Sequence, residues 1–133
     1  MYSLAKFKKS PWSLIVYQGN CVIFRSKASS LLPLIRFLDK ISVKGKKHIF
    51  YDKYVGRAAA LLMIIAKPAE INTPIISSNA IKLLKSKGIC VNYSKEVKYL
   101  MGFASDEMCK WEKLSFGTSS DNFYKLVKSR KVR

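Results

Sequence analysis

The sequence predicts a three-layer α/β/α domain, in which a mixed sheet lies between two layers of helices. Nine consecutive apolar residues, Ala58 to Ala66, predict a helix that must be covered on every side. Short β-rich runs alternate with amphipathic segments, which favours right-handed crossovers and a largely parallel sheet. Two β-rich runs separated by Gly19-Asn20 predict a hairpin that adds an antiparallel strand.

The first half of the chain is expected to form the hairpin, a helix, a strand and the apolar helix. The hairpin covers 13–24 and is followed by a helix over 31–41, whose apolar residues recur every three or four positions. These are Leu31, Leu34, Ile35 and Leu38. A brief strand over 48–51 then leads into the apolar helix. That helix ends at Lys67-Pro68, because proline cannot continue the helical hydrogen-bond ladder.

The alternation of strand and helix continues after this proline. A strand is predicted over 71–76, where Pro74 favours an edge position or a bulge. A helix over 79–87 should end at Gly88, since glycine readily adopts the left-handed conformation that closes a helix. Ile89, Val91 and Tyr93 then alternate as a further strand.

The last third is expected to be less regular. One helical turn is predicted over 96–101, an irregular stretch over 102–117 and a helix over 118–133. The residues of the last helix that would face inward are Phe123, Leu126 and Val127. With 133 residues the chain has room for one domain and hardly for two.

The charge of the chain is strongly unbalanced, with 25 Lys and Arg against 8 Asp and Glu and a formal net charge of +17. Such a surface attracts nucleic acid or anionic membrane. A lysine-rich proteome and a solvated surface would give the same composition, so both interpretations stay open. The excess is concentrated at the C-terminus, where no acid follows Asp121. The cations there are Lys125, Lys128, Arg130, Lys131 and Arg133.

A cytoplasmic location is expected. The first nine residues are polar and basic, and no apolar segment typical of a signal peptide follows them. The apolar run 58–66 is far shorter than the roughly 20 residues that a membrane span needs, so we expect no transmembrane segment. Cys21, Cys90 and Cys109 are odd in number and form no CxxC pair, which favours reduced thiols.

A candidate site lies at the entrance to the apolar helix, where Asp52, Lys53, Gly56 and Arg57 gather. We expect Asp52 to cap the helix and the two cations to share a face just inside it, where the helix dipole disfavours them. Gly56 in the first turn would weaken the helix further. These costs indicate a place where a phosphate, carboxylate or base approaches the backbone. Alternatively, Asp52 only caps, both cations point into water and Gly56 admits a neighbouring strand.

A second pair of candidate residues lies further along the chain. Cys109 and Glu112 could supply a nucleophile and a base. Alternatively, Cys109 is a small buried hydrophobe, and Glu112 pairs with a neighbouring lysine. His48 has no candidate metal ligand close to it in the sequence, so a structural or solvated histidine is the favoured interpretation.

These residues resemble a family signature. Asp52-Lys53, Gly56 and Ala58-Ala59-Ala60 are similar to the "DK, two residues, G, one residue, AAA" signature of an uncharacterised prokaryotic family, the domain-of-unknown-function family numbered eighteen ninety-three. Cys109 and Glu112 resemble its Cys-Pro-x-Glu segment, although Lys110 replaces the proline and the preceding Asn-Arg pair is absent. The resemblance extends from about residue 14 to about residue 112.

The resemblance implies a cytidine-deaminase-like fold for a single domain over 1–133. Its parts would be a basic lead-in over 1–11, a deaminase-like core over 12–117 and a basic C-terminal helix over 118–133.

The same resemblance implies where a deaminase would hold zinc. Catalytic deaminases place a His-x-Glu at the start of the central helix and a Cys-x-x-Cys at the start of the next helix. The corresponding stretches here, 52–58 and 77–83, contain no His, Cys or Glu. Since a catalytic zinc needs three such ligands, we expect no metal, no cofactor and no zinc-dependent deamination.

The leading hypothesis is therefore a non-catalytic, deaminase-like domain that binds a small anionic or nucleotide-like ligand. The residues expected to bind it are Asp52, Lys53, Gly56, Arg57, Cys109 and Glu112. One alternative is an RNA- or DNA-associated protein that uses its basic surface. A second alternative is a metal-independent enzyme of unknown reaction that uses Cys109, Asp52 or Lys53.

Overall fold

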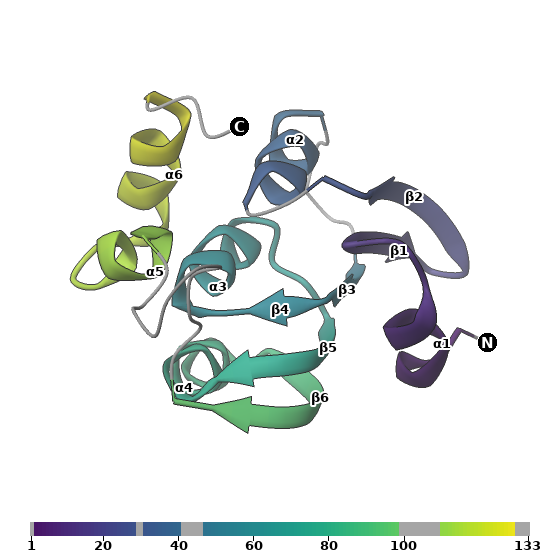
Figure 1. The fold of residues 1–133 in the computed structure, drawn as a ribbon. Helices are drawn as coiled ribbons and strands as arrows, with labels where there is room; N and C mark the ends of the chain where they lie inside the picture. The colour runs from purple at the N-terminus through teal and green to yellow at the C-terminus, as the bar shows by residue number, and fades with distance from the viewer. Residues whose placement is uncertain (1, 29–30, 41–46, 99–109, 130–133) are drawn as a thin grey trace.

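The chain folds into a mixed α/β domain, seen in a computed structural model that describes residues 2–28, 31–40, 47–98 and 110–129, without the side chains of 110–112 and 129. These residues form six helices and a six-stranded mixed sheet (Figure 1). In chain order the elements are α1 (Leu4–Lys9), β1 (Leu14–Gln18), β2 (Cys21–Ser26), α2 (Leu32–Lys40), β3 (His48–Asp52), β4 (Tyr54–Val55), α3 (Arg57–Ile65), β5 (Glu70–Ser77), α4 (Ser78–Ser86), β6 (Cys90–Val97), α5 (Lys110–Ser115) and α6 (Ser120–Ser129).

The sheet combines an antiparallel hairpin with parallel strands, as the sequence predicts. β1 pairs antiparallel with both β2 and β3, while β5 pairs parallel with β3, β4 and β6. β4 lies on the same edge of β5 as β3, because Ile75 and Ile76 pair with β4 on one side and with β6 on the other. β3 and β4 therefore act as one strand interrupted at Lys53.

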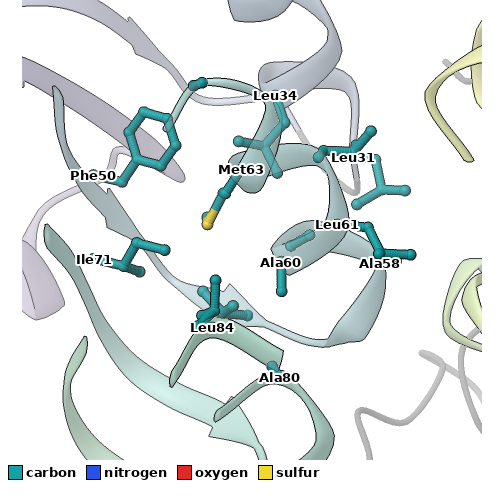
Figure 2. Close-up of a cluster of buried hydrophobic side chains, with 14 of the residues drawn as sticks. Leu31, Leu34, Phe50, Ala58, Ala60, Leu61, Met63, Ile71, Ala80 and Leu84 are labelled. Atoms are coloured by element: carbon teal, nitrogen blue, oxygen red, sulfur yellow. The ribbon is translucent and has the colours of Figure 1, made fainter. Parts of the chain in front are cut away.

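Helix α3 is the buried centre of the fold, which confirms the prediction drawn from its apolar run. Ala58 to Met63 are all buried, and α3 contacts α2, α4, α5 and α6. Figure 2 shows Met63 pointing from α3 toward Phe50 of β3 and Ile71 of β5. Full burial of one such side chain stabilises the fold by roughly 1.5–3 kcal/mol.

The opposite face of the sheet is covered only in part. The predicted lead-in forms α1, whose Phe7 packs with Ile15 and Tyr51 in a second, smaller core. β6, in contrast, is exposed along most of its length, and Asn72 and Asn92 are hydrogen-bonded side chain to side chain at 3.0 Å across β5 and β6. The described helices thus gather mainly on the α3 face, and two complete helical layers are not seen.

Strand β5 shows how Pro74 is accommodated. It does not lie at an edge, because β5 is paired on both sides. Ile71 and Ile76 belong to the same core although they are five residues apart, an odd spacing that places residues on opposite faces of a regular strand. The alternation of side chains between the two faces of β5 therefore shifts between Ile71 and Ile76. The prediction of an edge position is wrong, and the pairing shows no bulge at Pro74 either, because β5 keeps the same register with β6 on both sides of the proline.

Several predicted boundaries in the second half also change. The strand expected over 89–93 is β6, which continues through Val97 and so replaces the start of the helical turn expected over 96–101. Part of the stretch expected to be irregular forms α5. The C-terminal helix is confirmed as α6, with Phe123 and Val127 fully buried. Within the described ranges, no helix is long and apolar enough to cross a membrane.

Candidate ligand site at the start of α3

Helix α3 begins later than the sequence predicts. Its N-cap is Gly56, with extended backbone angles of φ −101° and ψ −174°, and Arg57 is its first residue. Asp52 does not cap it, because β3 runs through Asp52 and the chain returns to the sheet as β4. The prediction is wrong because pairing of Tyr54 and Val55 with β5 holds them extended, and local sequence patterns do not show this tertiary pairing.

Asp52 lies at the carboxyl end of β3, in register with Leu14 of β1. Its Oδ1 accepts a hydrogen bond from the backbone N–H of Tyr54 at 3.4 Å. Burial raises the pKa of the Asp52 carboxyl from 3.8 to about 7, although the backbone N–H groups of Tyr54 and Lys53 act in the opposite direction. Near neutral pH this carboxyl is present in both forms, so it can either donate or accept a hydrogen bond.

Lys53 turns away from α3 toward α1. Its backbone N–H donates to the Ser13 carbonyl at 3.1 Å. Its Nζ donates to the Ser10 carbonyl at 2.5 Å and lies 4.8 Å from the centre of the Phe7 ring. Desolvation lowers the pKa of the Lys53 amine. The side chain is therefore held by the connection between α1 and β1.

Arg57 points to the end of α5. Its Nε donates to the Ser115 carbonyl at 3.2 Å, and its guanidinium carbon lies 5.7 Å from the centre of the Phe116 ring. Phe116 is 40% exposed, so the ring under Arg57 is open to solvent. Lys53 and Arg57 consequently do not share a helical face, which corrects the predicted geometry. The sequence does not single out Phe116, because nothing local distinguishes it within a stretch expected to be irregular.

The structure describes only part of the second pair of candidate residues, Cys109 and Glu112. Cys109 lies outside the described residues. Glu112 lies on α5, where the backbone alone is described. Since α5 contacts α3 and its Ser115 receives the Arg57 hydrogen bond, the backbone at Glu112 belongs to the element beside the start of α3.

His48 is a structural residue at the opposite end of β3 from Asp52. It is fully buried beside Phe37 and Phe50, with ring centres 5.4 and 6.5 Å away. Neither ring nitrogen has a hydrogen-bond partner in the part of the chain that the structure describes. Of the two interpretations left open, the solvated histidine is wrong. Among the described side chains, no three His, Cys, Asp or Glu gather as metal ligands, and the thiols of Cys21 and Cys90 are free and exposed.

The fold and these residues define a mixed α/β domain with a partly buried Asp52 at the carboxyl end of a sheet strand, where desolvation raises the pKa of its carboxyl to about 7. The family model of a domain of unknown function, DUF1893 (TM1506), matches residues 3–130, so the chain belongs to that family and the predicted membership is confirmed. The crystal structure of a DUF1893 family protein (TM1506) from Thermotoga maritima is similar, with a TM-score of 0.85 and 30% sequence identity. The match covers 96% of this chain and 86% of that one. No curated protein matches the chain.

Proposed function

We propose that this protein is a non-catalytic, deaminase-like domain that binds a small anionic or nucleotide-like ligand at the start of α3. The observation that carries the proposal is the Asp52 carboxyl, whose pKa burial raises to about 7 beside the entrance to the central helix. Burying a carboxyl in this way lowers stability, and groups with strongly perturbed pKa values cluster at functional sites. A residue retained at such a cost is a candidate for direct contact with a ligand.

The deaminase-like part of the proposal has two supports. One is the resemblance of Asp52-Lys53, Gly56 and the following alanines to the family signature. The other is the arrangement of a hairpin that leads into parallel strands joined by the crossover helices α3 and α4. This arrangement is compatible with a three-layer α/β/α sandwich, with α1 on one face of the sheet. The stretches 52–58 and 77–83 hold no His, Cys or Glu, so a bound ligand would meet no zinc ligands of the deaminase type there.

The chemistry of the site suits a flat anion. The N-terminus of α3 attracts negative charge through the helix dipole, and the Arg57 guanidinium adds a full positive charge at the same end. The exposed Phe116 ring offers an aromatic surface to a base. The Asp52 carboxyl can pair with an amide or ring nitrogen. Lys53, Gly56, Cys109 and Glu112 stay part of the proposed site, with Lys53 more distant than the sequence predicts because its amine bonds to Ser10.

Thermal denaturation in the presence of inorganic phosphate, AMP, CMP and UMP tests the proposal. A ligand that binds the native state raises the stability by RT ln(1 + [L]/Kd), so at least one nucleotide should raise the midpoint in a concentration-dependent way. Asp52→Ala and Arg57→Ala should abolish the rise. Lys67→Ala is the matched control, because this exposed lysine follows the other end of α3. Stabilisation that survives both site substitutions would refute the site.

The second candidate function is association with RNA or DNA through the basic surface. The net charge of +17 favours it, as does the absence of any Asp or Glu from residues 1–38. Binding should fall steeply with salt. Removing residues 125–133 is a poor test, because it would also remove the fully buried Val127; Lys125→Glu, at an exposed position of α6, changes the charge alone.

The third candidate is a metal-independent enzyme that uses Cys109, Asp52 or Lys53. Modification of Cys109 by a thiol reagent at neutral pH, compared with the exposed Cys21 and Cys90, is its first test. A Cys109 that reacts no faster than these two would count against an activated nucleophile.

A further inference from the structure

The N-terminal part of the chain carries positive charge without any acid. Residues 2–28 contain five cations, and the first acidic residue of the whole sequence is Asp39. The five are Lys6, Lys8, Lys9, Arg25 and Lys27, and all five are exposed. This concentration is not evident from the net charge, and it lies far in the sequence from the basic C-terminus.

The fold gathers these cations on one face of the sheet. α1 packs through Phe7 on the face that carries Ile15 and Tyr51. Arg25 is the register partner of Ile15, and directly paired residues of neighbouring strands project to the same face. The Arg25 side chain therefore lies on the α1 side of the sheet, with Lys27 two residues further along the chain.

Trp12 contacts two of these cations. The guanidinium carbon of Arg25 lies 4.5 Å from the centre of the Trp12 ring, and the Nζ of Lys27 lies 4.9 Å from it. Lys53, at the junction of β3 and β4, belongs to the same surface, because its Nζ bonds to the Ser10 carbonyl and lies over Phe7. Tyr54, the next residue, is 61% exposed. We call this set the N-terminal basic surface: Lys6, Lys8, Lys9, Trp12, Arg25, Lys27, Lys53 and Tyr54.

We propose that the N-terminal basic surface binds single-stranded nucleic acid. The proposal rests on the second candidate function, association with RNA or DNA, and assigns that function to this one surface. Cations alone would attract any polyanion, but here a planar guanidinium, an indole and an exposed phenol lie among them. Flat groups of this kind stack on unpaired bases while the neighbouring cations contact the phosphates. A membrane is the less suitable partner, because Phe7 of α1 packs against the sheet and Leu4 is partly buried there, so α1 has no apolar face to insert.

Fluorescence anisotropy with a fluorescein-labelled 12-nucleotide oligo(dT) tests this surface between 20 and 300 mM NaCl. The variant Arg25→Glu/Lys27→Glu should weaken binding at least about tenfold at 50 mM salt. The slope of log affinity against log salt should become shallower by about 0.7 for each phosphate of the single strand that the variant no longer neutralises. The matched control is Lys82→Glu/Lys85→Glu. It makes the same change in net charge at two exposed positions of α4, a helix of the α3 face.

A second readout follows Trp12 itself. In a Trp111→Phe background Trp12 is the remaining tryptophan, and its emission should change on titration with oligo(dT) and be insensitive to the α4 substitutions. Equal weakening by both double variants would overturn the surface while leaving nucleic-acid binding in place. No binding at 20 mM NaCl would overturn the surface and the second candidate function together.

Further arms of the experiment separate the kinds of partner. A 12-base-pair duplex should bind more weakly than oligo(dT), and vesicles with 20% phosphatidylserine should not protect Trp12 from iodide quenching. Equal or tighter binding of either would overturn the assignment to single strands.

Discussion

Asp52→Asn is the sharpest test of the carboxyl at the entrance to α3. Asparagine has nearly the same shape, and its Oδ1 can still accept the hydrogen bond from the Tyr54 N–H, which is 3.4 Å from the aspartate oxygen. It removes only the charge. The substitution therefore isolates the effect of ionising this group inside the protein.

The size and direction of the effect follow from the pKa. In the unfolded chain the Asp52 carboxyl loses its proton near pH 3.8, whereas in the folded protein burial holds the pKa at about 7. Between these values the native state binds more protons than the unfolded state, so stability falls as the pH rises through this window. A difference from 3.8 to about 7 corresponds to about 4 kcal/mol of lost stability above pH 7, at 1.36 kcal/mol for each pH unit.

Urea denaturation of both proteins at pH values from 4 to 8.5 measures this effect. At pH 4 the two should have similar free energies of unfolding. Above pH 7 Asp52→Asn should be the more stable protein by about 4 kcal/mol, or about 2 M in urea midpoint for an m-value near 2 kcal/mol/M. Other titrating groups contribute equally to both proteins and cancel in the difference. A difference that is independent of pH, or an asparagine variant less stable at pH 8, would refute the argument.

Three further substitutions test the packing and the helix ends. Met63→Ala should lower the free energy of unfolding by about 2–5 kcal/mol because Met63 is fully buried, and Ile65→Ala, at a partly buried position, should cost less in the same urea assay. Gly88→Ala should lower the free energy of unfolding by about 1 kcal/mol. The loss comes from the backbone angle of φ +73° alone, since an added Cβ meets nothing within 4 Å. Gly88→Asn should lower it less, because asparagine tolerates that angle better. Asp39→Asn should remove the exposed ion pair to Lys128, whose nitrogen lies 3.0 Å from the carboxylate, and lower the urea midpoint at low salt. That loss should vanish in 1 M NaCl, and a loss that persists there would point instead to the Tyr124 hydrogen bond with Asp39.

Sequence and structure agree most closely along α3 itself. The run of apolar residues from Ala58 predicts a helix buried on every side, and six of its residues are indeed buried. Hydrophobic patterning succeeds there because burial of an all-apolar helix is independent of which neighbours cover it. Local chemistry also predicts the hairpin turn at Gly19, with φ +62°, and the end of helix α4 before Gly88.

Predictions that depend on a neighbour distant in the sequence are the ones that fail. Tyr54 and Val55 look compatible with the first turn of a helix, but they pair with Ile75 and Ile76 and so extend the sheet. Pro74 favours an edge, yet β5 is paired on both sides, and the proline falls in the gap between the pairs that β5 makes with β3 and with β4. Secondary-structure propensity predicts the conformation of a segment poorly wherever such tertiary pairing competes with it.

The sequence by itself determined the family, the buried central helix and the mixed order of strands, because these depend on apolar periodicity, on glycine and proline, and on a local signature. Only the tertiary structure decided what the residues before α3 do. It places Asp52 where burial raises its pKa, sends Lys53 to Ser10 and Phe7, and sends Arg57 to Ser115 and Phe116. The physical reason is that the direction and the desolvation of a charged side chain are set by neighbours from distant parts of the chain.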